Sequence, residues 1–69
     1  MNVEQALVLG KNRLKKANMQ NYALEAELLL MHSISFTRIQ LYTKNNSMLT
    51  QAEEKAFFSA LQQREKGRP

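Results

Sequence analysis

Few side chains in this 69-residue chain could take part in catalysis. His32 is the only histidine, and the chain has no cysteine or aspartate, so it lacks a thiol nucleophile and a paired-histidine metal motif. His32 is also the only general base expected near neutral pH, and Glu25, seven residues before it, could approach it only loosely. Glu25 and Glu27 would project from different faces of a helix and would not form a carboxylate pair. These residues predict packing or surface roles, with no catalytic centre.

Basic residues form the densest charged group, at Lys11, Arg13, Lys15 and Lys16. The formal net charge of +4 favours an acidic partner such as nucleic acid or the ribosome. The same group is also typical of a solvated helix end, where cations interact favourably with the helix dipole. Both interpretations stay open from these residues alone.

The aromatic residues bear on the same question, because nucleic-acid binding usually adds exposed rings for stacking. The five aromatic residues here occupy mostly core-like positions. Phe58 is the exception, since it lies about 100° around a helix from Phe57. Phe58 would therefore either cover a second neighbour or be exposed, and an exposed Phe58 would mark a docking patch.

The composition is that of one small cytoplasmic domain. With 69 residues and no cysteine, the chain is stabilised neither by disulfides nor by a cysteine-rich metal site, and apolar packing must hold it together. The hydrophobic fraction of 43% is sufficient for a folded domain. The N-terminus has no signal peptide, and no apolar run reaches membrane-spanning length. We therefore expect a monomer in the cytoplasm, without contact with a membrane.

Helical spacing dominates the chain. A first helix is predicted over residues 3–17, with Asn2 as its N-cap and Gln5 three residues further on. Gly10 falls on the apolar face of this helix, which indicates that a neighbouring helix approaches closely.

A second helix is predicted over residues 22–34, capped by Asn21 or Asn18. Its leucines cover most of its circumference, and a helix that is apolar nearly all round is buried by several neighbours. We expect this Leu-rich helix at the centre of the bundle.

Two more helices follow, each with a Thr cap. Thr37 and Gln40 form the capping box of a short third helix, and Thr50 and Glu53 form that of the last helix. The last helix is expected to bury a stripe formed by Ala52, Ala56, Phe57, Ala60 and Leu61.

The end of the chain resembles a helix stop followed by an extended exit. Gly67 can close the last turn in left-handed geometry, and Pro69 cannot continue the helix. We expect residues 1–66 to form an all-α bundle of four to five helices with no sheet. Residues 67–69 would begin a linker to a second domain.

Residues 22–32 resemble the "Ala-Glu-x-Leu-Leu-x-His" helix in the N-terminal domain of the HemK/PrmC family, which are protein-glutamine methyltransferases that act on peptide chain release factors. Residues 35–41 fit the small loop, Arg and Leu that follow in the family. Residues 57–69 resemble its last N-terminal helix and the "Arg-Arg-x-x-Gly-Glu-Pro" exit.

This exit matches the family in part. Arg64, Gly67 and Pro69 agree with the family pattern, whereas Gln63 replaces an Arg and Arg68 replaces a Glu. The helix stop is therefore kept, and the two substituted positions depart from the family at the interdomain exit.

The resemblance implies a substrate-recognition domain for a class-one release factor. The full-length protein would be an enzyme with a C-terminal domain that binds S-adenosylmethionine and methylates a glutamine amide nitrogen. This chain would itself bind no cofactor or metal, perform no turnover and contact no nucleic acid directly. The partner contacts that we expect are Arg13, Lys16, Arg38 and Phe58.

Two other functions fit the residues alone. One is a small basic nucleic-acid-binding module, whose affinity would fall steeply with salt. The other is a protein-interaction or dimerisation module that docks through Phe58 and neighbouring apolar residues.

Overall fold

Four helices account for most of residues 1–67, which are the residues that the computed structural model describes. They are α1 (Val3–Lys16), α2 (Tyr22–Ile34), α3 (Arg38–Thr43) and α4 (Gln51–Glu65). Over this range, β pairing is limited to an isolated bridge between Asn2 and Met48. The predicted all-α bundle without a sheet is confirmed, and it has four helices.

Local capping begins three of these helices. The predicted boxes of Asn2 with Gln5, Thr37 with Gln40, and Thr50 with Glu53 are all formed, each with both of its hydrogen bonds. The second helix differs, because Asn21 stands at its N-cap position but its side chain makes no capping bond. Asn18 has a left-handed backbone (φ 62°) in the preceding turn. The prediction is therefore confirmed for the N-cap position, which Asn21 occupies, but no asparagine side chain caps the helix.

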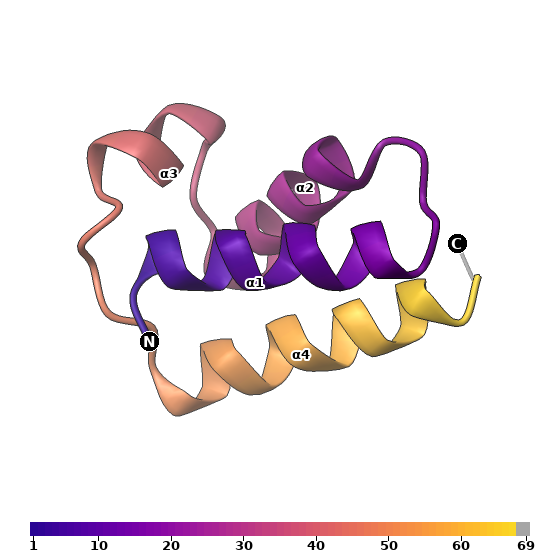
Figure 1. Ribbon diagram of the computed structural model, residues 1–69. Helices are drawn as coiled ribbons and strands as arrows, with labels where there is room; N and C mark the ends of the chain where they lie inside the picture. Colours follow the sequence, from indigo (N-terminus) through magenta and orange to yellow (C-terminus); the bar gives the residue numbers. More distant parts are fainter. Residues whose placement is uncertain (68–69) are drawn as a thin grey trace.

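The helices pack in two layers (Figure 1). Helices α1 and α4 lie side by side and run in the same direction, while α2 runs back behind them. The short α3 lies near the beginning of α1. Backbone hydrogen bonds from Val3 N–H to Ser47 O (2.9 Å) and from Leu49 N–H to Met1 O (2.9 Å) join the loop after α3 to the start of α1.

The core lies between α1, α2 and α4. Its largest fully buried side chains are Val3, Leu14, Leu30, Leu41, Phe57 and Leu61. Gly10 lies within this core, where Phe57, Ala26 and Leu61 surround the position that a Cβ atom would occupy. The predicted close approach of a helix to Gly10 is therefore confirmed.

Two expectations about burial are wrong. Helix α2 contacts the other three helices, which confirms its predicted central place. It is not covered on all sides, however, because Leu24 and Leu28 are 43% and 46% exposed. Helix α4 buries Phe57 and Leu61, whereas Ala52 and Ala56 are exposed. A four-helix domain of this size offers each helix few neighbours, so one face of α2 stays in contact with solvent.

Candidate functional site

The carboxylates that could support catalysis are used in ion pairs instead. Glu25 Oε1 accepts a hydrogen bond from Arg64 Nε at 2.9 Å, which ties the start of α2 to the end of α4. His32 is exposed on the last turn of α2 and forms no hydrogen bond or ion pair within residues 1–67. Over the same range, no group of three or more His, Cys, Asp or Glu side chains could hold a metal ion.

A second ion pair fastens the same end of the bundle. Arg13 Nε donates to Glu65 Oε2 at 3.0 Å and Arg13 Nη2 donates to Glu65 Oε1 at 2.5 Å, so the guanidinium binds the carboxylate in bidentate fashion. This pair joins the last turns of α1 and α4. Together with Glu25 and Arg64, it fixes the position where the chain leaves α4.

Arg64 also changes the acidity of its partner. Its hydrogen bond to Glu25, which outweighs the cost of partial burial, lowers the pKa of the Glu25 carboxyl. The same hydrogen bond raises the pKa of the Arg64 guanidinium. Both groups therefore carry full charge at neutral pH.

Helix α3 is attached to α2 through one carboxylate. Glu27 Oε1 lies 3.3 Å from Arg38 Nε, and Glu27 also accepts a hydrogen bond from the Tyr42 hydroxyl. This hydrogen bond raises the pKa of Tyr42, because losing the phenolic proton would place two negative charges together. Arg38, a predicted partner contact, is thus engaged within the domain, although its side chain is 54% exposed.

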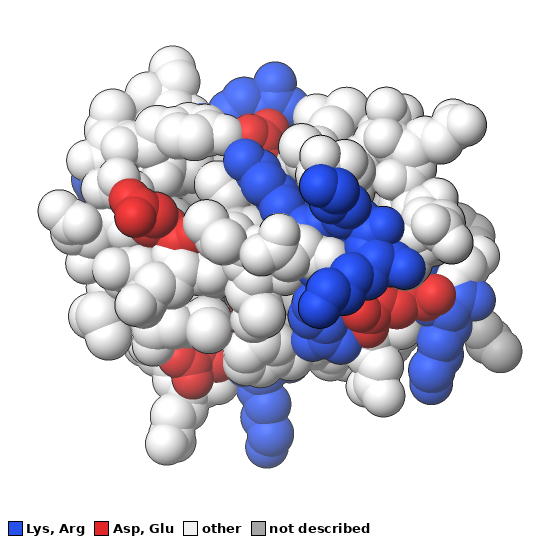
Figure 2. Space-filling model, viewed as in Figure 1, with Lys and Arg blue, Asp and Glu red and all other residues white. Residues whose placement is uncertain are grey.

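Basic side chains gather where α1 and α4 end (Figure 2), on a surface that we call the basic end. Its basic members are Lys11, Arg13, Lys15, Lys16, Arg64 and Lys66, and its acidic members are Glu25 and Glu65. Lys15 and Lys16 are exposed and form no ion pair within residues 1–67. The Lys15 ammonium lies 5.9 Å from the centroid of the Tyr22 ring, which it partly covers.

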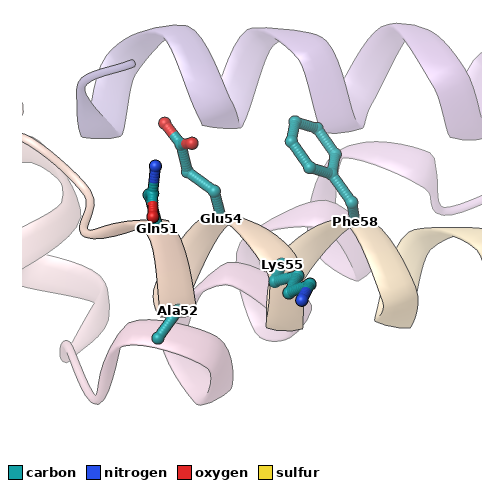
Figure 3. A pocket seen from close by; sticks show the side chains of 5 residues that line it. All are labelled: Gln51, Ala52, Glu54, Lys55 and Phe58. Carbon is teal, nitrogen blue, oxygen red and sulfur yellow. The ribbon is translucent and has the colours of Figure 1, made fainter.

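Phe58 lies on a different part of the surface. It is half-buried against the core and its ring points towards α1 (Figure 3), with its centroid 6.3 Å from that of Phe57. Phe58 therefore covers a second neighbour and still lines an open hollow. The other residues that line this hollow are Gln51, Ala52, Glu54 and Lys55.

A second hollow lies along α1, and Glu54 of the first hollow forms an ion pair with one of its lining residues. The Glu54 carboxylate lies 2.8 Å from the N-terminal ammonium group of Met1, which lines the second hollow with Val8 and Leu9.

The predicted partner contacts do not form one surface. Arg13 and Lys16 lie together at the basic end, Arg38 lies on α3, and Phe58 faces α1. Sequence reasoning missed the partners of the arginines, namely Glu65 for Arg13 and Glu27 for Arg38. Arg13 and Glu65 are 52 residues apart, so no local pattern could have indicated their pairing.

The fold and the surface define a small helical module with a cluster of basic side chains at one end and two open hollows. Comparison with protein-family models gives a match to the PrmC N-terminal domain over residues 5–69. The chain therefore belongs to the PrmC N-terminal domain family, whose domain forms part of the release-factor glutamine methyltransferases. Neither a search of curated proteins nor one of solved structures finds a match. Within residues 1–67, no helix has the length and hydropathy needed to cross a membrane.

Proposed function

We propose that residues 1–66 recognise a class-one peptide chain release factor on behalf of an S-adenosylmethionine-dependent protein-glutamine methyltransferase. The match to the PrmC N-terminal domain over nearly the whole chain is the observation that carries this proposal. The catalytic domain would follow residue 69, and the protein would act in the cytoplasm as part of translation termination. In this role residues 1–66 bind and orient the protein substrate and carry out no turnover.

The geometry of the exit supports this division of work. Gly67 has a left-handed backbone (φ 76°), as predicted for the residue that closes a helix. Arg64, one turn earlier, holds the end of α4 against α2. Arg68 and Pro69, also assigned to the interdomain exit, lie outside the described residues. A fixed exit direction would let the helical domain set where the release factor stands relative to the catalytic domain.

Positioning is what such a reaction needs. An amide nitrogen is a weak nucleophile, so much of the acceleration must come from holding it in line with the methyl group. A helical domain that binds the release factor away from the reacting glutamine supplies binding energy for this orientation.

Deletion of the domain tests the proposal. The full-length enzyme and a form without residues 1–66 are compared on an intact class-one release factor and on a short peptide containing Gly-Gly-Gln. We expect the deletion to lower kcat/KM for the intact factor and to leave that for the peptide nearly unchanged. Calorimetric binding of S-adenosylmethionine checks that the shortened enzyme is folded. Equal kcat/KM values for the intact factor would refute the recognition role.

A further inference from the structure

The surplus charge of the described chain is concentrated at the basic end. This surface carries six basic and two acidic side chains, a surplus of four positive charges. The remaining residues up to residue 67 contribute three basic and four acidic side chains. The domain is therefore polarised, with its excess positive charge where α1 and α4 end.

The ion pairs decide which of these charges can reach a partner. Arg13 donates from Nε and Nη2, one edge of its guanidinium, to Glu65, and Arg64 donates from Nε to Glu25. Lys15 and Lys16 are exposed beside them and are joined by Lys66 at the C-cap of α4. The lysines therefore form the accessible part of the basic end.

We propose that the basic end is the surface that docks on an acidic region of a protein partner, an inference that rests on the proposed function. Leu24, which precedes Glu25 in the first turn of α2, is 43% exposed, and protein interfaces cover apolar side chains of this kind. The positive field would steer the acidic partner to this end of the domain and fix its orientation.

A protein partner agrees better with this surface than a nucleic acid does. Single-stranded nucleic acids bind on exposed aromatic rings, but the Tyr22 ring beside Lys15 is half-buried and is partly covered by the Lys15 ammonium. One edge of the Arg13 guanidinium is taken by Glu65 and the Nε atom of Arg64 is taken by Glu25, so both arginines are already engaged with carboxylates of the domain. The accessible lysines are point charges that suit scattered carboxylates on a protein.

Charge reversal in the full-length enzyme tests this docking. Lys15→Glu with Lys16→Glu should raise KM for the intact release factor about tenfold at low salt, because it reverses the steering field. The same variant should reduce the salt dependence of KM and leave kcat/KM for the Gly-Gly-Gln peptide unchanged. Lys44→Glu with Lys55→Glu, which makes the same change in charge away from the basic end, should alter KM by less than about twofold.

A milder variant guards against misfolding. Glutamates at the end of α1 interact unfavourably with the helix dipole and could destabilise the fold. Lys15→Gln with Lys16→Gln, which removes the positive charges without adding negative ones, is therefore measured as well. It should raise KM by a smaller factor, about threefold. Thermal unfolding of each variant checks the fold. An unchanged KM in this folded glutamine variant overturns the docking surface.

The outcomes separate this inference from the proposed function. If deletion of residues 1–66 raises KM but the lysine variants do not, recognition stands and the basic end is excluded. If deletion has no effect, the proposed function itself fails. A labelled single-stranded RNA provides the third comparison: tight binding that is lost in the lysine variants, with KM for the release factor unchanged, would assign the basic end to nucleic acid and overturn the inference.

Discussion

Gly10 of α1 faces Phe57 of α4 so closely that a Cβ atom at Gly10 would lie 2.8 Å from Phe57 Cζ. The same Cβ atom would lie 3.3 Å from Cβ of Ala26 on α2. Three helices thus meet at one residue that has no side chain. This contact places α4 against α1 and α2, and so determines where the chain leaves the bundle.

Gly10→Ala should therefore destabilise the domain. Alanine favours the helix by about 1 kcal/mol relative to glycine, but overpacking a filled core costs about 1–3 kcal/mol. Phe57 is fully buried and the Cβ of Ala26 cannot rotate away, so we expect the steric effect to prevail. Urea unfolding should show a net loss of about 1 kcal/mol, and a gain in stability would contradict the packing described above.

A substitution at Phe57, the residue that faces Gly10, supplies the control. Phe57→Leu removes the ring atom nearest to the new methyl group while keeping an apolar side chain. The double variant with Gly10→Ala should lose less stability than the two single variants together, by about 0.5 kcal/mol or more. Additive losses would show that the Phe57 ring is not what opposes the methyl group.

Local sequence patterns predicted much of the fold because they describe bonds that are themselves local. The Thr37 and Thr50 boxes each join residues three positions apart, and both are formed. The close contact at Gly10 was predictable because a glycine on an apolar helix face weakens the helix unless a neighbour fills the space of its missing side chain. Exposure of Leu24 was not predictable, because it depends on how many neighbours α2 has and where they lie.

The candidate site was less predictable than the fold. The basic residues of α1 were evident from the sequence, but their availability depends on contacts with distant residues. Arg13 forms an ion pair with Glu65, whereas Lys16, only three positions further on, stays exposed. Residue type alone does not distinguish a structural arginine from a lysine that is open to a partner.

The ion pair between Glu25 and Arg64 should make stability depend on pH. Because Arg64 lowers the pKa of Glu25 in the folded state, the charged pair stabilises the fold above the unfolded-state pKa of Glu25, about 4.3. This contribution is lost as the pH falls through the lower folded-state pKa. We expect Glu25→Gln to melt at a lower temperature than the wild type at pH 7, and the difference to shrink in acid.

Arg64→Gln provides the matched test of this mechanism. This substitution removes the guanidinium whose hydrogen bond is the main cause of the lowered Glu25 pKa. The Glu25 carboxyl should therefore titrate closer to its ordinary value in the folded domain. Carboxyl chemical shifts measured by NMR would follow this titration directly. An unchanged Glu25 titration in Arg64→Gln would exclude the guanidinium as the cause.

Tyr42 should titrate at a raised pH because of Glu27. In a Tyr22→Phe background, Tyr42 is the only tyrosine, and its ultraviolet absorbance reports its ionisation alone. Glu27→Gln should lower the Tyr42 pKa, since it removes the negative charge that opposes the phenolate. The raised pKa also means that this hydrogen bond stabilises the fold below the unfolded-state pKa of about 10 and is lost as the pH rises through the folded-state value. An unchanged midpoint in Glu27→Gln would contradict this assignment.

The two kinds of N-cap in this domain predict unequal effects of alanine. Thr50 Oγ1 accepts a hydrogen bond from Glu53 N–H at 3.1 Å, so Thr50→Ala leaves that donor without its partner and should cost about 1 kcal/mol. Asn21 occupies the same position before α2 but makes no capping bond, so Asn21→Ala should change stability by less than about 0.5 kcal/mol. Urea unfolding of both variants measures the difference. Similar losses in the two variants would contradict the absence of a side-chain cap at Asn21.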